Sequence, residues 1–148
     1  MALIQSDVAT GKKAVPQPYD ALVSKVPVDV TLPATAAAND IIELSGLPPG
    51  VALVDYDIVA PQLDSNGTPT LAFSLGVLNA GKTDLATVYE TGLTFGRTAS
   101  GSISRCGNAA AAQADRSAAR VLGLKVTTAA ATAAMAGKTF TAILHLRH

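Results

Sequence analysis

Residues 51–79, VALVDYDIVAPQLDSNGTPTLAFSLGVLN, contain the pattern that decides the fold class of this 148-residue chain. Apolar and polar side chains alternate through 51–60 and again through 70–79, which is the period of a strand with one buried face. Between the two runs, Ser65-Asn66-Gly67 supplies residues that tolerate the positive φ of a tight reversal. We therefore expect 51–60 and 70–79 to pair as a β-hairpin.

The same rhythm continues on both sides of this stretch. Runs rich in Val, Ile, Leu and Thr are separated by turn residues at intervals of roughly ten positions, as in a sandwich or barrel. These further runs are 23–32, 40–47, 120–128 and 136–147. Pro27 cannot donate a ladder hydrogen bond, so we expect the strand in 23–32 either to lie at a sheet edge or to begin after Pro27. The alternation is absent from 99–119, which we expect to be a long loop with a helical turn at 109–114.

The first twenty residues differ from the rest, because glycine, lysine and proline interrupt any regular pattern. We predict two parts: an extended N-terminal arm over 1–20, and an antiparallel, jelly-roll-like β-sandwich over 21–148. An isolated arm of this kind does not bury enough apolar area to offset its ordering entropy, so we expect it to become ordered on a partner. By adding a strand to an exposed sheet edge it would bind through four apolar anchors, Leu3, Ile4, Val8 and Val15.

Charge and composition narrow the classes of function. Eleven Lys plus Arg balance eleven Asp plus Glu, so the chain lacks the excess positive charge that drives nucleic-acid binding. Three Phe, three Tyr and no Trp leave little material for an aromatic sugar-binding platform, although an adhesive or carbohydrate-binding β-sandwich remains the alternative function. We find neither a signal-peptide pattern nor an apolar run of about 18 residues that could span a membrane, so we expect synthesis in the cytoplasm.

Residues Gly76 to Thr83, GVLNAGKT, match the phosphate-loop pattern G-x-x-x-x-G-K-[ST]. A working phosphate loop follows a strand and opens directly into a helix, whose N-terminus helps to bind the phosphates. β-Branched residues and Gly92 after Thr83 do not favour such a helix. Ala-Gly-Lys-Thr recurs at 136–139, so we interpret both copies as turns in which glycine takes an unusual φ. A nucleotide-binding protein that uses Gly76–Thr83 is the less favoured alternative.

Other reactive side chains form no recognisable catalytic, cofactor or metal site. Cys106 is the single cysteine, which excludes an internal disulfide and is typical of a reducing compartment. Asp55 and Asp57 share one face of a predicted strand, and we interpret them as solvated. His145 and His148 are interpreted as an edge-strand residue and a frayed end, because two histidines alone make no metal site.

The strand pattern resembles that of the decoration or cement proteins, the small auxiliary head proteins of tailed bacteriophages. The resemblance covers most of 20–148 and is carried by DIIELSGLPPGVALVDYDIVAPQLDSNGTPTLAFSLGVLN at 40–79 and by AGKTFTAILHLR at 136–147, behind a polar N-terminal arm. It does not extend to the 99–119 loop.

This resemblance implies a structural virion protein without enzymatic activity, cofactor or catalytic residues. Such a protein would bind the capsid exterior, contact the major capsid protein and hold neighbouring shell subunits together. It would have a jelly-roll or related fold and assemble as a homo-oligomer, a dimer or a trimer.

Overall fold

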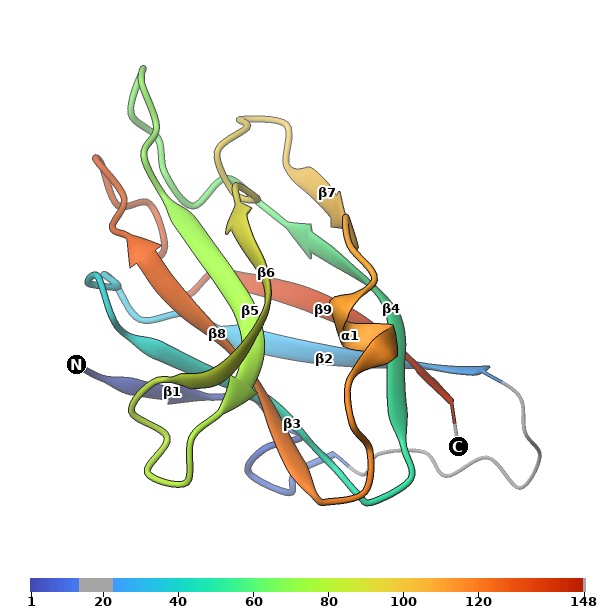
Figure 1. Cartoon of the computed structure of the whole chain (residues 1–148). Coiled ribbons are helices and arrows are strands. Elements are labelled where there is room, and N and C mark those ends of the chain that lie inside the picture. Colours follow the sequence, from blue (N-terminus) through green and yellow to red (C-terminus); the bar gives the residue numbers. More distant parts are fainter. Residues whose placement is uncertain (14–22, 148) are drawn as a thin grey trace.

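The computed structural model describes residues 1–13 and 23–147, which form nine β-strands and one short helix (Figure 1). The first five strands are β1 (Leu3–Gln5), β2 (Val23–Thr31), β3 (Ile41–Leu47), β4 (Ala52–Ala60) and β5 (Ala72–Leu78). The remaining elements are β6 (Leu85–Leu93), β7 (Ser102–Arg105), α1 (Ala110–Gln113), β8 (Arg120–Thr128) and β9 (Thr139–Arg147).

The strands form two sheets with a shared core between them. One sheet has the order β1-β3-β8-β5-β6, and the other has the order β2-β9-β4-β7. Neighbouring strands are antiparallel except for β1 and β3, which run parallel. Apart from β1, the eight strands are distributed over the two sheets in the order of a jelly roll, a pair of packed Greek keys. The predicted antiparallel, jelly-roll-like β-sandwich is therefore confirmed.

The core consists mainly of aliphatic side chains on the inner faces of both sheets, with a small aromatic centre. On β9, for example, Phe140, Ala142, Leu144 and Leu146 are all buried while the intervening residues are more exposed. The rings of Phe73 and Phe95 stack with centroids 4.3 Å apart, and Phe140 lies 5.5 Å from Phe95. The period-two patterns at 23–32, 70–79 and 139–146 thus follow the buried faces. In 51–60, Leu53 and Tyr56 are both buried although the alternation places them on opposite faces, because the register of β4 shifts between Leu53 and Asp55.

The expected hairpin of 51–60 and 70–79 was wrong. These residues form β4 and β5, which belong to different sheets, so the chain between them crosses from one sheet to the other. The same holds for every other connection from β2 onward except β5 to β6. Alternation indicates only that a strand has one buried face. A turn sequence between two strands allows them either to pair in one sheet or to lie in different sheets.

The edge position predicted from Pro27 was correct, since β2 is the outermost strand of its sheet. The expected loop at 99–119 contains the predicted helical turn as α1, but it also contains β7, which we did not predict. No helix in the described residues is long and apolar enough to cross a membrane.

Candidate functional site

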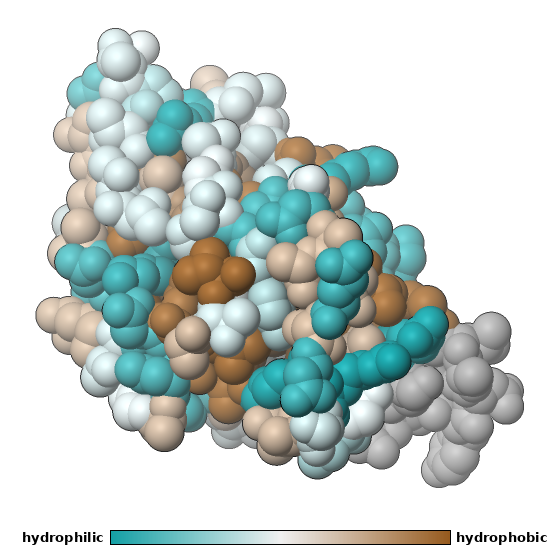
Figure 2. All heavy atoms as spheres, viewed as in Figure 1, coloured by the Kyte–Doolittle hydropathy of each residue, from teal (hydrophilic) through white to brown (hydrophobic). Residues whose placement is uncertain are grey.

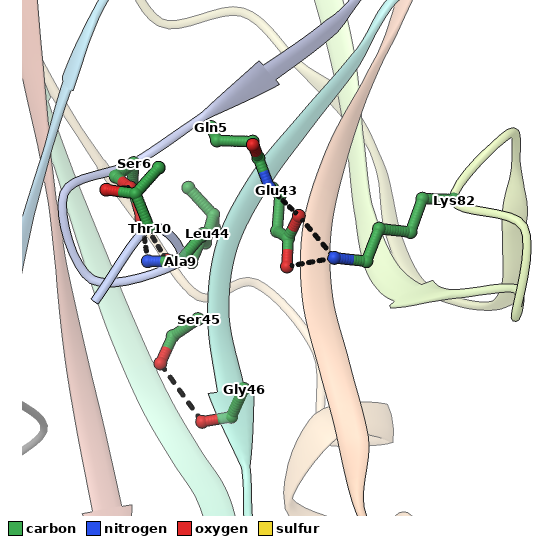
Figure 3. A network of polar contacts seen from close by, with 9 residues as sticks. All are labelled: Gln5, Ser6, Ala9, Thr10, Glu43, Leu44, Ser45, Gly46 and Lys82. Atoms are coloured by element: carbon green, nitrogen blue, oxygen red, sulfur yellow. Dashed lines mark hydrogen bonds and ion pairs between the residues drawn. The ribbon is translucent and has the colours of Figure 1, made fainter.

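The GVLNAGKT stretch is part of the β5–β6 hairpin and not of a phosphate loop. Gly76 lies within β5, and the chain continues after Thr83 into the strand β6. Lys82 occupies the turn with a φ of 53°, and its Nζ lies 2.8 Å from both carboxylate oxygens of Glu43 (Figure 3). Glu43 is nearly buried, with a side-chain exposure of 5%. The amine that would contact phosphate is therefore paired with a carboxylate of β3.

The two Ala-Gly-Lys-Thr segments are both turns, but they bend at different residues. At 136–139 the positive φ belongs to Gly137, at 65°, as expected of glycine. At 80–83 it belongs to Lys82, so our assignment of the unusual φ to glycine was wrong there. Asn79 makes this turn possible, because its side-chain oxygen accepts the N–H of Thr83 at 2.8 Å and its C=O accepts the N–H of Lys82 at 2.9 Å.

The N-terminal residues begin with a short strand on the chain's own sheet. β1 pairs with β3 in the register Leu3 to Ile41. Ser6 donates its backbone N–H to the C=O of Glu43, and Gln5 donates its side-chain amide to the Glu43 carboxylate at 2.8 Å (Figure 3). Polar contacts thus connect this segment to the β3 backbone.

The four predicted anchors have different surroundings. Val8 is 9% exposed and belongs to the core cluster, and Ile4 is half-buried against that cluster. Leu3 is 44% exposed. Val15 lies outside the described residues. A role of these residues in binding a partner stays a prediction, and Leu3 is the most exposed of the three anchors that the structure describes.

Asp55, Asp57 and His145 meet on the outer face of the four-stranded sheet. His145 Nδ1 lies 3.6 Å from an Asp55 oxygen, and Nε2 lies 3.2 Å from an Asp57 oxygen. The Asp57 side chain is only 22% exposed, so it is less solvated than we predicted. His145 lies on β9, a central strand, and its assignment to an edge strand was wrong. His148 is outside the described residues, within which no group of three potential ligands is arranged to hold a metal.

Cys106 lies beside a second polar cluster, next to α1. Its thiol donates to the C=O of Asn108 at 3.0 Å, and burial raises the pKa of this thiol, which keeps it in the less nucleophilic form. The Glu90 carboxylate accepts the Tyr56 hydroxyl and the backbone N–H of Gly107. These bonds hold the segment after β7 against β4 and β6.

A shallow apolar groove lies at one end of the five-stranded sheet. One cavity of about 630 Å³ adjoins the ends of β3, β5 and β8, and a second of about 440 Å³ lies between β5, β6 and the segment from α1 to β8. The two cavities share Val77 and Arg120 as lining residues. In Figure 2 the apolar surface appears as a brown patch over β5, β6 and β8. The walls otherwise consist mainly of alanine, valine and leucine side chains, with few polar groups.

The four-stranded sheet has its own exposed apolar residues, beside β7. Ile103 is 62% exposed and faces Val59, which is 40% exposed, across the β4–β7 pair. The sequence does not reveal this site, because Ser-Ile-Ser-Arg at 102–105 offers a single apolar side chain, and that side chain is exposed to solvent. The available signal was a lone large apolar residue in a polar segment.

Comparison with known proteins gave matches only among solved structures. No protein-family model matches the chain, and no curated protein matches it in sequence. A chain in the structure described as "Capsid of Ralstonia phage GP4" is 35% identical, with a TM-score of 0.85 over 99% of this chain and 98% of that one. A chain in the "Cyanophage Pam1 capsid asymmetric unit" is 22% identical, with a TM-score of 0.63 over 92% of each chain. At that identity the second match shows the fold alone.

Proposed function

Because this chain belongs to the family of phage capsid proteins represented in the Ralstonia phage GP4 capsid, we propose that it binds the outer surface of a phage head and stabilises contacts between major-capsid subunits. The family makes it a structural component of a virion. Beyond this, we propose that the chain lies on the exterior of the capsid, that its partner is the major capsid protein, and that it serves as a decoration protein.

One observation carries the proposal. A chain of a phage capsid matches this one along 98% of its own length at 35% identity, so the complete sandwich is a unit used in a capsid. The decoration-protein pattern at 40–79 and 136–147 then favours an auxiliary subunit over the shell-forming one. The ion pair between Lys82 of the phosphate-loop motif and Glu43 argues against the nucleotide-binding alternative.

The shape of the molecule suits attachment to more than one shell subunit. Stable protein interfaces bury about 800 Å² per partner, and a jelly roll presents two broad sheet faces as well as its loops and edges. The apolar groove on one sheet and the exposed Ile103 and Val59 on the other give two separate surfaces for such contacts. Self-association into a dimer or trimer is part of the proposal.

The decisive experiment mixes the purified chain with phage heads that were assembled without it. We expect saturable binding with a fixed number of copies per head, and electron microscopy should locate the added density outside the shell. Heads already saturated with the chain are the matched control and should take up none. If the chain binds no heads but is retained on a glycan array, the adhesive-module alternative would replace this proposal.

A further inference from the structure

The free edge of β7 presents unpaired backbone groups. β7 pairs with β4 in the register Val59 to Ile103 and Asp57 to Arg105. Cys106 donates its N–H to the C=O of Tyr56 at 3.0 Å, which makes Tyr56 and Cys106 a hydrogen-bonded pair in this antiparallel ladder. Because such pairs alternate along the ladder, Ser102 and Ser104 bond to β4.

Ile103 and Arg105 therefore direct their N–H and C=O groups away from β4, toward the outside of the sheet. β7 lies at the edge of this sheet (Figure 1). No loop in the described part of the chain forms a backbone hydrogen bond with these groups. An exposed row of this kind is a template for another strand, and proteins commonly block it when it has no partner.

β2, at the opposite edge of the same sheet, shows how this chain blocks an edge. Leu32 donates its N–H to the C=O of Lys138 at 2.9 Å, so Leu32 and every second residue before it in β2 bond to β9. Pro27 is one of the residues in between, whose backbone groups face the free side of β2. Proline has no N–H, so this edge lacks a donor in its centre.

The other two edges are also poor templates for an added strand. β6 is covered in part by the segment after β7, because Asn108 donates to the C=O of Tyr89 at 2.6 Å. β1 is a three-residue strand in a parallel pair. β7 thus differs from these edges, because in the described residues no proline interrupts it and no other segment bonds to its outward-facing backbone groups.

The side chains around β7 indicate the chemistry of its partner. Ile103 and Val59 form an exposed apolar pair, and a cavity of about 450 Å³ lined by both of them lies beside it. Arg105 has a side-chain exposure of 79% and lies 3.7 Å from Asp57, which leaves most of the guanidinium free. A bound strand with an apolar residue next to Ile103 and an acidic residue next to Arg105 would complement this edge.

We propose that the β7 edge binds an extended segment of the capsid shell protein, which adds to the four-stranded sheet as a fifth strand through the backbone groups of Ile103 and Arg105. The proposal rests on the proposed function and specifies where the shell is contacted. A four-residue edge is far smaller than the roughly 800 Å² per partner of a stable dimer, so a second copy of this chain is the weaker occupant. On a shell, the sheet-face contacts hold the segment nearby and raise its effective concentration.

The test introduces a proline into β7, as Pro27 occurs in β2. Ile103→Pro removes an outward-facing N–H together with the exposed apolar side chain, and it leaves the ladder bonds of Ser102 and Ser104 in place. We expect a nearly unchanged melting temperature and at least a tenfold weaker binding to heads assembled without the chain. Ile103→Thr, which keeps the N–H and the strand propensity, should retain more of the affinity than the proline variant.

Substitutions of the charged Arg105 provide a second test, which does not depend on whether β7 tolerates a proline. Arg105→Glu should weaken binding to the heads more than Arg105→Gln does, and Arg105→Lys should weaken it least. Hydrogen exchange of the Ile103 and Arg105 amides should slow when the wild-type chain is on the heads.

The outcomes separate this inference from the proposed function. If the wild-type chain binds heads and the folded Ile103→Pro and Arg105→Glu variants bind equally well, the β7 edge is not the contact, and the decorating role stands. If the wild-type chain itself fails to bind, the proposed function fails first. If sedimentation shows a wild-type dimer that Ile103→Pro abolishes, the edge takes a second copy, and the shell segment is excluded.

Discussion

At the scale of single residues, Asp64 shows how the loops at one end of the sandwich are held. This carboxylate is completely buried and accepts backbone N–H groups at 2.8 to 3.2 Å from five residues, Asn66, Thr70, Leu71, Ala131 and Thr132. Burial alone raises the pKa of Asp64, but the N–H donors outweigh it and hold the pKa well below its usual value. The carboxylate thus holds the loop segment 64–71 against the loop segment 131–132.

We predict that Asp64→Asn lowers the free energy of unfolding by about 2 to 4 kcal/mol, because the NH2 that replaces one carboxylate oxygen would face backbone N–H donors and cannot accept their hydrogen bonds. Urea unfolding monitored by circular dichroism measures the change. Asp84→Asn is the control, since the Asp84 side chain is 55% exposed and contacts Lys125 at the surface. Equal losses in the two variants would contradict a special role for Asp64.

The lowered pKa of Asp64 also predicts how stability depends on pH. Its stabilising contribution is fully present above the unfolded-state pKa of about 3.9 and is lost as the pH falls toward the folded-state value. Between about pH 4 and pH 2 the wild-type chain should therefore lose more stability than Asp64→Asn. Parallel curves for the two proteins over this range would show that folding does not lower the pKa of this carboxyl group.

At the scale of elements, the β5–β6 hairpin depends on a close backbone approach. A Cβ built on Gly76 would lie 2.1 Å from the C=O oxygen of Thr87, a backbone atom of β6. The register between these strands shifts on both sides of Gly76, so the irregular pairing requires a residue without a side chain.

Gly76→Ala should therefore destabilise the protein by about 1 to 3 kcal/mol, or more if β6 is displaced. Gly46→Ala is the matched control, because Gly46 also lies in a strand of this sheet but has no atom within 4 Å of its added Cβ. Thermal unfolding of the two variants provides the comparison. A Gly76→Ala variant as stable as Gly46→Ala would contradict the close approach of β5 and β6.

Two substitutions in the N-terminal segment distinguish a structural role from a binding role of these residues. Leu3→Ser should leave the melting temperature nearly unchanged, because Leu3 is 44% exposed, yet it should weaken attachment to heads if the segment contacts the shell. Val8→Ser should instead destabilise the fold, since Val8 belongs to the core cluster. Unchanged head binding by Leu3→Ser would indicate that β1 serves only the chain's own sheet.

At the scale of the whole molecule, binding to a shell should stabilise the chain itself. A partner that binds only the folded state adds RT ln(1 + [L]/Kd), about 2.7 kcal/mol at a site concentration of one hundred times Kd. We therefore predict a higher melting temperature on heads assembled without the chain than in free solution, as measured by calorimetry. Heads that are already saturated should produce no shift, and equal melting in both cases would argue against the proposed attachment.

The sequence by itself determined the fold class and the positions of most strands. Alternation at 51–60 and 70–79 identified two strands, and in 70–79 also the inner side, because the period of side-chain direction in a strand is a local property. Pro27 restricted its strand to a sheet edge or to a start after the proline, since a missing N–H has the same consequence in any fold. The residues after Thr83 likewise argued correctly against a phosphate loop, because the helix that such a loop needs is also a local feature.

Only the tertiary structure decided which strands pair and which edges remain open. β4 and β5 were expected to form a hairpin, yet they lie in different sheets, because strand order depends on packing between residues far apart in the chain. β7 was missed for the same reason: Ser102 and Ser104 become strand residues only through their hydrogen bonds to β4. The candidate shell contact at Ile103 thus arises from pairing that the local sequence does not encode.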